Sequence, residues 1–309
     1  MTMDRFINII VMVTLIEMMI AVGLRVTLAD LIGVARNWRL VAQALVANYV
    51  CVPAIAVALL LLFQAPPLAC AGFLILAVCP GAPFGPPCTG LAKGNVTASV
   101  GLMVILAGSS ALLAPLLLAL LLPWMAGDEP LQVDAGKIVS TLLMTQFVPL
   151  CLGLAVRYWR PGWADKLSKP ANVASLALNL LAFGLILATK YSLLLEIRLR
   201  GYVGMTVLLA TTFAVGWLFG ERGSANRKAM TLTTSLRNVG VGLVIAMGAF
   251  AGTAAVTAVL VYGILEILGS LLLAFVWAQQ AQRAKLPAAK KASPGDTKEP
   301  LEKAGVRRT

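Results

Sequence analysis

The sequence predicts an all-α, polytopic membrane protein with nine transmembrane helices, built as an inverted repeat that contains two discontinuous helices. Three observations lead to this prediction. Sixty per cent of the 309 residues are hydrophobic, the mean hydropathy is +0.89, and only 12% of the residues are charged, about half the charged fraction of a soluble domain. Nine apolar runs are each long enough to cross about 30 Å of hydrocarbon. Two of these runs contain residues that a continuous apolar helix avoids.

The predicted spans follow one another with short connectors that hold most of the charged residues. They cover residues 6–24, 40–63, 68–92, 98–124, 138–159, 173–191, 202–220, 230–251 and 254–278. After residue 281 the sequence becomes polar and rich in Pro and Lys, without apolar periodicity. We expect this basic tail, residues 282–309, to be disordered, and its cations to be able to contact anionic lipid headgroups.

The Lys and Arg residues of the connectors predict how the chain is oriented. Nineteen of them lie on the side of the C-terminal tail and five on the opposite side. Because cytoplasmic connectors carry the excess of Lys and Arg, we expect a multi-pass protein of the cell (plasma or inner) membrane with a cytoplasmic C-terminus and an external N-terminus.

The third span is interrupted by four prolines and two glycines among residues 80–87. Proline removes an amide donor and clashes with the preceding turn, so a continuous helix cannot pass through this segment. In lipid, each backbone group left unpaired costs several kcal/mol. We therefore expect two half-helices whose ends are packed in protein or line a polar cavity.

The eighth span is interrupted by polar side chains, which are Thr231, Thr233, Thr234, Ser235, Arg237 and Asn238. An arginine at the centre of a membrane helix costs about 3 kcal/mol on insertion scales. The two interrupted spans are five apart, an odd number, so they occupy matching positions in two halves of opposite orientation. Paired interruptions of this kind indicate the binding site of a secondary transporter.

Several classes of function are disfavoured. The chain has no histidine, which excludes His-based acid–base and nucleophilic catalysis. Its five cysteines lie in apolar runs without the paired spacing of a metal site or a disulfide framework. We expect no enzyme activity, no metal, no other cofactor and no nucleic-acid partner. A membrane receptor or scaffold that does not transport stays open as an alternative.

Several segments resemble the bile acid:sodium symporter (BASS or SBF) family over residues 15–278. They are Cys79-Pro-Gly followed by Leu91-Ala-Lys-Gly-Asn-Val-Thr-Ala-Ser99, the stretch from Val22 to Asp30, Asn48 to Pro53, Ser235-Leu-Arg-Asn-Val-Gly240 and Gly269-Ser270. The resemblance implies that the two broken helices cross at their unwound centres. It also implies that a core and a panel hold an organic anion between them and expose it alternately to each side.

The resemblance further implies a division of the chain. Residues 1–38 would form a panel helix and its connector, 39–125 the first core half, 126–200 two panel helices and 201–281 the second core half. The predicted substrate contacts lie at and beside the two breaks. They are Arg237, Asn238, Thr233, Thr234, Ser235, Ser99, Gly81 and Gly85.

The family's sodium ligands are mostly replaced in this sequence. The family's Ser-Asn pair falls on Gly85 and Pro86, its Glu falls on Thr233, and its Gln falls on Arg237. Ser99 and Asn238 are kept, whereas a second hydroxyl position falls on Met103. Since sodium requires oxygen ligands, this divergent member is expected to have weak or no sodium coupling. Arg237 is then either the fixed counter-charge of the anion or a structural cation that pairs with Glu17 or Glu266 or binds unwound carbonyls.

Glu17 and Glu266 are the two acidic residues deep in predicted spans, so they are the candidate coupling residues. A carboxyl group away from water favours its neutral form, which suits a proton carrier. For Glu266, proton coupling and a static salt bridge with Arg237 both stay open, and Glu17 is the weaker candidate. Cys79 and Cys88 flank the first break, which leaves an arsenite-type permease as a further alternative.

Overall fold

The computed structural model describes residues 3–125, 133–195, 199–221 and 223–291, and it is helical throughout these ranges apart from short connectors. Six of the described helices are long and apolar enough to cross a membrane, which confirms a polytopic helical membrane protein. They are Arg5–Arg25, Trp38–Leu62, Val96–Met125, Ala135–Trp159, Leu199–Phe219 and Ala254–Arg283.

The first half of the chain runs from α1 to α7. Its elements are α1 (Met3–Arg25), α2 (Leu28–Arg36), α3 (Trp38–Val46), the π-helical turn η1 (Ala47–Cys51), α4 (Val52–Leu62), α5 (Pro67–Ala77), α6 (Gly85–Leu91) and α7 (Val96–Met125). The second half contains α8 (Ala135–Leu142), the π-helical turn η2 (Leu143–Phe147), α9 (Val148–Trp159), α10 (Pro161–Leu195), α11 (Leu199–Phe219), α12 (Ser224–Ser235), α13 (Val239–Ala249) and α14 (Ala254–Lys291).

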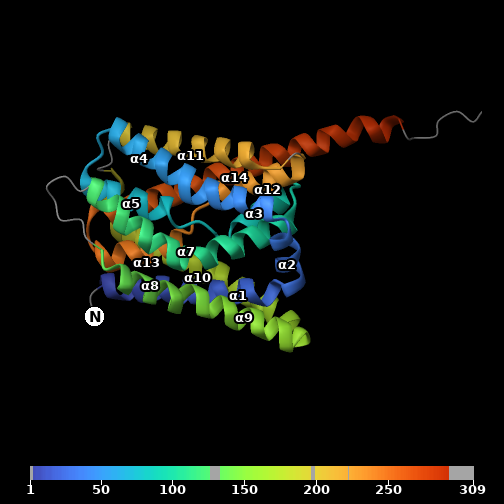
Figure 1. Cartoon of the computed structure of the whole chain (residues 1–309), viewed down its shortest axis with the longest axis horizontal. Helices are drawn as coiled ribbons and strands as arrows, with labels where there is room; N and C mark the ends of the chain where they lie inside the picture. The colour runs from blue at the N-terminus through green and yellow to red at the C-terminus, as the bar shows by residue number, and fades with distance from the viewer. Residues whose placement is uncertain (1–2, 126–132, 196–198, 222, 292–309) are drawn as a thin grey trace, which may run out of the picture.

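The helices run roughly parallel to one long axis (Figure 1). Helices α4 and α11 pack along one edge, and α1 packs against α9 and α10 along the opposite edge. Between these edges lie α5, α7 and α13, and α14 packs against both α5 and α13. Helix α1 begins at one end of the molecule, and α14 projects from the other end (Figure 1). The short helices of the two breaks are therefore surrounded by long ones.

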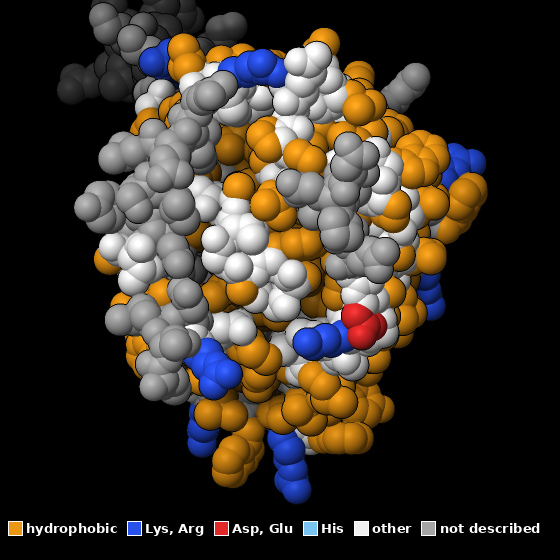
Figure 2. Space-filling view, turned by 90° about the vertical axis from the view of Figure 1, so that its left-hand side faces the viewer, with side chains coloured by type: hydrophobic (Ala, Val, Ile, Leu, Met, Phe, Trp, Pro, Cys, Tyr) orange, Lys and Arg blue, Asp and Glu red, His pale blue; other side chains and the backbone are white. Residues whose placement is uncertain are grey.

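On the end of the molecule at which α1 begins, hydrophobic side chains alternate with other side chains and backbone in the described part of the surface (Figure 2). Lys and Arg side chains are scattered around its margins, and the described acidic side chains are sparse on this face. Helix α14 continues to Lys291, beyond residue 281 where the predicted tail begins. Residues 292–309 of that tail lie outside the described part of the chain.

Proline explains both π-helical turns. Pro53 and Pro149 lack the amide hydrogen that would bind the carbonyl four residues earlier. In each case the chain accommodates one extra residue just before the proline, so that Val52 donates to the carbonyl of Ala47 and Val148 donates to that of Leu143. A π-turn rotates the following side chains relative to a regular α-helix. It therefore changes which polar residues of these two spans point inward.

The two interrupted spans each form a pair of short helices, as the sequence predicts. Helix α5 ends at Ala77 and α6 begins at Gly85, whereas α12 ends at Ser235 and α13 begins at Val239. The unwound segments meet: Pro80 and Arg237 form an isolated antiparallel bridge, and the amide of Asn238 donates to the carbonyl of Cys79 at 2.8 Å. The two breaks thus satisfy part of each other's backbone hydrogen bonding, as a non-helical segment at membrane depth requires.

Candidate functional site

The guanidinium group of Arg237 lies at the centre of the meeting breaks and is 2% exposed. Its Nε donates to the carbonyl of Leu76 at 3.0 Å. Its Nη1 donates to Asn48 Oδ1 at 2.6 Å and to the carbonyl of Thr234 at 3.2 Å. Its Nη2 donates to the carbonyls of Ala77 and Asn48. An arginine has five N–H donors, so these contacts engage the whole guanidinium group.

The carbonyl partners of Arg237 belong mainly to helix C-termini. Leu76 and Ala77 end α5, and Thr234 is the penultimate residue of α12. The C-terminus of a helix carries a partial negative charge, which a nearby cation stabilises. One buried cation therefore stabilises the helix C-termini of both interrupted spans. This geometry corresponds to one of the two alternatives given for Arg237, in which it is a structural cation that binds unwound carbonyls.

Glu266, on α14, contacts Arg237 through the backbone. Its Oε1 accepts a hydrogen bond from the Arg237 amide at 2.9 Å, and the side chain is fully buried. Among the described residues no ion pair joins the two side chains. The static salt bridge, one of the two alternatives left open for Glu266, is not formed between these side chains, because the guanidinium group is directed at the helix carbonyls. Glu266 Oε2 has no hydrogen-bond partner in the described structure.

Most of the predicted hydroxyl contacts lie together beside the breaks and are fully or almost fully buried. Ser99 Oγ lies 3.1 Å from Thr233 Oγ1 and 3.0 Å from Thr89 Oγ1, which also bonds the carbonyl of Gly85 at 3.0 Å. These contacts join α6, α7 and α12 in one hydroxyl cluster.

Two further hydroxyl groups of α12 extend from this cluster. Thr234 Oγ1 accepts from Asn48 Nδ2 at 3.3 Å, and Ser235 Oγ lies 3.3 Å from Ser270 Oγ of α14. The polar residues of the eighth span therefore reach η1 and α14 as well as α7.

Asn238 and Gly81 shape the unwound segments themselves. Asn238 caps α13, since its Oδ1 accepts from the Val241 amide at 3.2 Å, while its buried Nδ2 has no partner in the described structure. Gly81 has φ +88°, and a Cβ there would lie 2.5 Å from the backbone nitrogen of Ala107. Glycine is required at this point both by the backbone conformation and by the approach of α7.

Asn48 is absent from the predicted set of contacts although it binds Arg237 through both its side chain and its carbonyl. It lies in η1, is fully buried, and also donates to Ala44 at 2.9 Å. The sequence signal was a polar residue in an apolar span five positions before Pro53. Gln146 of η2, three positions before Pro149, follows a similar pattern and is also fully buried.

Glu17 lies apart from this cluster of contacts. Its half-buried carboxylate accepts from Ser175 on α10 at 2.5 Å. The described structure shows no ion pair between Glu17 and Arg237. The suggested pairing of these two residues is therefore not present.

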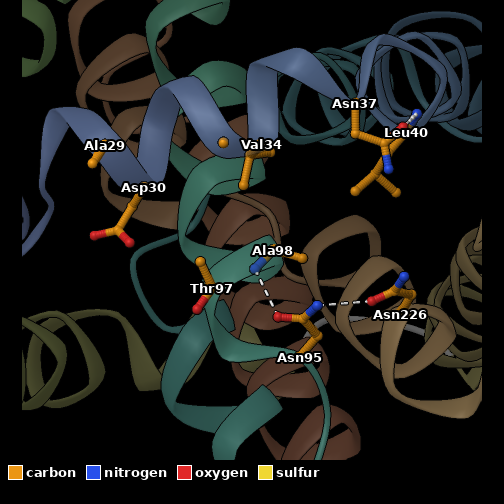
Figure 3. Close-up of a pocket in the computed structure, with 10 residues that line it drawn as sticks. Ala29, Asp30, Val34, Asn37, Leu40, Asn95, Thr97, Ala98 and Asn226 are labelled. Atoms are coloured by element: carbon orange, nitrogen blue, oxygen red, sulfur yellow. Dashed lines mark hydrogen bonds between the residues drawn. The ribbon is translucent and has the colours of Figure 1, made fainter.

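A cavity of about 310 Å³ lies between α2, the start of α7 and the start of α12 (Figure 3). It is lined by Ala29, Asp30, Gly33, Val34, Asn37, Leu40, Asn95, Thr97, Ala98 and Asn226. None of the predicted site residues lines this cavity, although Ala98 precedes Ser99 of the hydroxyl cluster.

Glu221 binds two of the residues that line this cavity. Its Oε1 accepts from Asn37 at 2.7 Å and its Oε2 from Asn226 at 3.1 Å. Asn226 in turn accepts from Asn95 at 2.9 Å, and Asn95 caps the start of α7 through the Ala98 amide at 3.1 Å. The carboxylate therefore links three connectors.

Cys79 and Cys88 are buried free thiols. Within the described ranges, no group of three or more His, Cys, Asp or Glu residues is arranged to hold a metal ion.

Comparison with known proteins adds two findings. The model of the sodium bile acid symporter family matches residues 12–197, a segment that contains the first break. The chain is also 24% identical over 258 residues to YocS of Bacillus subtilis (strain 168), which is described as an uncharacterized sodium-dependent transporter. That alignment covers 81% of this chain and 77% of the relative.

Proposed function

The chain belongs to the sodium bile acid symporter family and is a membrane transporter, not an enzyme, and we propose that it carries a small or medium organic anion by alternating access. The observation that carries the proposal is the meeting of the two breaks around the buried cation of Arg237. Nine spans in two inverted halves account for this meeting, because each half contributes one interrupted helix at the same depth.

The anion is bound next to Arg237 without direct contact with its guanidinium group. All five N–H donors of that group already have protein partners. The unpaired Nδ2 of Asn238, at the positive end of α13, is a better donor for a carboxylate. Arg237 then supplies the charge, and Asn238 supplies the hydrogen bond. The hydroxyl groups of Ser99, Thr233, Thr234 and Ser235 and the backbone at Gly81 and Gly85 form the surrounding polar wall.

We further propose that Arg237 replaces the sodium ions of the family, so that transport has weak or no sodium coupling. The guanidinium group sits where it neutralises the C-termini of α5 and α12. The relative YocS is described as sodium-dependent, so the two proteins would differ in this respect.

The test is uptake of radiolabelled carboxylates into proteoliposomes with sodium or with choline as the only external cation. We expect equal initial rates in the two conditions. We also expect Arg237→Met to abolish uptake, with Arg200→Met, at the start of α11, as the folded control. Loss of uptake on removing sodium would overturn the replacement of sodium by Arg237, and absence of uptake for every carboxylate tested would overturn the function.

A proton-coupled mechanism is the second candidate, because Glu266 Oε2 is buried without a hydrogen-bond partner. A carboxyl group in this position can hold a proton that it exchanges when the site opens. Arg237 and Tyr262 are the charged and titratable groups that interact with it. Uptake that follows an imposed pH gradient, and that loses this dependence in Glu266→Gln, would support proton coupling. Uptake insensitive to the gradient in the unmodified protein would exclude it.

A further inference from the structure

Two tryptophan rings lie together near the end of the molecule from which α14 projects (Figure 1). Trp217 is in the last turn of α11, and Trp277 is in the last turns of the apolar span Ala254–Arg283 of α14. Their ring centroids are 5.7 Å apart, with an interplanar angle of 33°. Tryptophan is enriched where membrane spans reach the headgroup layer. The pair therefore marks the position of this layer on two neighbouring helices.

Each ring is covered by a cation from the start of α12. The guanidinium carbon of Arg227 lies 5.4 Å from the ring centroid of Trp217, and Nζ of Lys228 lies 5.7 Å from that of Trp277. Gly220 permits the first of these contacts, because a Cβ at that position would lie 2.7 Å from the Cα of Arg227. The two rings and the two cations together form what we call the Trp–cation surface.

The two cations of the Trp–cation surface are not neutralised by the protein. The one ion pair in the described ranges joins Arg157 and Asp165, so no described carboxylate pairs with Arg227 or Lys228. Lys228 donates to the carbonyl of Ala92 at 2.9 Å, and an ammonium group has two further donors. Arg227 is partly exposed, and its buried Nε has no hydrogen-bond partner in the described structure. The positive charge of this surface therefore favours an anionic ligand.

The helices that hold the two rings present hydrophobic side chains to the surroundings of the molecule. Leu218 of α11 is 76% exposed, and Leu272 and Val276 of α14 are 65% and 40% exposed. Both helices are long and apolar enough to cross a membrane, so these side chains contact lipid. A ligand with acyl chains can thus lie along α11 and α14 and place its headgroup at their ends.

We propose that the Trp–cation surface binds the headgroup of an anionic phospholipid. The lipid phosphate accepts charge-assisted hydrogen bonds from Arg227 and Lys228, and the acyl chains follow α11 and α14. The distribution of Lys and Arg favours a cytoplasmic position for this end, and the cytoplasmic leaflet carries anionic lipids. A free phosphate ion has the same charge but leaves the apolar sides of the helices unused. The inference does not depend on which substrate is transported.

The bound lipid would also act on the second break. Helix α12 runs from the two cations to Ser235, where the eighth predicted span is interrupted. A headgroup held at the start of α12, with acyl chains on α11 and α14, joins three helices that are far apart in the sequence. A ligand that binds the folded state alone raises its stability, so the lipid stabilises the position of α12.

The experiment measures lipid binding to the full chain by native mass spectrometry, with titration of phosphatidylglycerol or phosphatidylcholine. A cation close to an anionic headgroup contributes about fivefold to binding, so we expect phosphatidylglycerol to bind at least about tenfold more tightly. Arg227→Gln should lower this preference about fivefold, whereas Arg227→Lys keeps the charge and should retain most of it. Equal binding of the two lipids by the unmodified protein, or an unchanged preference in Arg227→Gln, would overturn the proposal.

Arg39→Gln is the matched control. The guanidinium carbon of Arg39 lies 5.7 Å from the ring centroid of Trp38, which is 68% exposed at the start of α3. This variant also removes one positive charge and one cation–π contact, but it leaves the Trp–cation surface intact. We expect it to keep the preference for phosphatidylglycerol. An equal loss in Arg39→Gln and Arg227→Gln would show that the net charge of the protein attracts the lipid, and would overturn the assigned site.

Inorganic phosphate distinguishes a lipid headgroup from a free anion. We expect phosphate in about tenfold excess to leave phosphatidylglycerol bound, because the ion lacks acyl chains. Displacement of the lipid by an equal concentration of phosphate would show that the surface holds an ion alone, and would overturn the lipid assignment. The comparison of the two lipids on the unmodified protein does not depend on whether Arg227→Gln folds.

Discussion

Arg237 and Pro80 are paired across the two interrupted spans in an antiparallel bridge. Proline has no amide hydrogen, so this pair lacks the donor that an ordinary bridge would have. The structure compensates locally: the Arg237 carbonyl accepts from Val239 at 2.9 Å, and the Arg237 amide donates to Glu266. The side chain of Arg237 then binds the carbonyls that the ends of α5 and α12 leave free. One residue therefore binds backbone groups of both breaks.

Asn48→Ala should destabilise this arrangement. The substitution removes the 2.6 Å acceptor of Arg237 Nη1 and leaves part of a buried cation unpaired. Hydrogen bonds to charged groups contribute about 1.5–3 kcal/mol, so we expect a clear fall in the midpoint of thermal unfolding in detergent. Asn48→Asp keeps an acceptor for the guanidinium group and should lose less stability. Equal midpoints for Asn48→Ala and the unmodified protein would contradict the assigned role.

Gly81→Ala should disrupt the junction of the two breaks. Residue 81 has φ +88°, and the added Cβ would lie 2.5 Å from the Ala107 nitrogen, which belongs to a helix backbone and cannot move aside easily. Strain of this kind costs about 1–3 kcal/mol before the steric clash is counted. We expect loss of transport and a lower unfolding midpoint.

Gly85→Ala is the matched control for this prediction, because its added Cβ would come no closer than 3.9 Å to any neighbour. It should retain the fold, with a change in the free energy of unfolding below about 1 kcal/mol. Similar behaviour of the two variants would show that the approach of Gly81 to α7 has no special importance.

The sequence predicts the two breaks because their causes are local. Prolines at 80 and 83 cannot continue a helix, those at 86 and 87 are tolerated only in the first turn of a new one, and Arg237 cannot lie in lipid, so each interruption can be located without knowledge of the neighbouring spans. The family resemblance implies that the two breaks meet, and the bridge between Pro80 and Arg237 confirms it. The family resemblance is likewise confirmed.

The partners of these residues could not be predicted in the same way. Asn48 reaches Arg237, and Gln146 reaches α7, from π-turns before Pro53 and Pro149 that change the direction of their side chains. The prolines are visible in the sequence, but which neighbouring helix each redirected side chain contacts depends on how the spans pack. Whether Arg237 binds a carboxylate or helix carbonyls also depends on where the C-termini of α5 and α12 lie in space. Sequence spacing does not determine these positions.

Gly153→Ala should separate α1 from α9. A Cβ at Gly153 would lie 2.4 Å from the carbonyl oxygen of Ile20, and one at Gly23 would lie 2.4 Å from that of Leu150, so the two helix backbones are in direct contact. Close packing through small residues is a main source of helix association in membranes. We expect a fall in the unfolding midpoint equivalent to about 1–3 kcal/mol. Gly248→Ala, which has no neighbour within 4 Å of its Cβ, should leave the unfolding midpoint unchanged. An unchanged midpoint in Gly153→Ala would refute the close crossing of α1 and α9.

Glu221→Ala should loosen the rim of the cavity in Figure 3. The carboxylate is the shared acceptor of Asn37 and Asn226, so its removal separates the α2–α3 connector from the start of α12. Thr97 lines the cavity, and Thr97→Cys in a chain without the five native cysteines provides a reporter for a water-soluble maleimide. We expect labelling to become several-fold faster when Glu221→Ala is added, because the connectors no longer hold the rim closed.

Asp165→Asn removes an acidic group that pairs with Arg157 and has no contact with this network, so it should leave the rate unchanged. An unchanged rate in Glu221→Ala, or equal acceleration in both variants, would show that the carboxylate does not hold the connectors together.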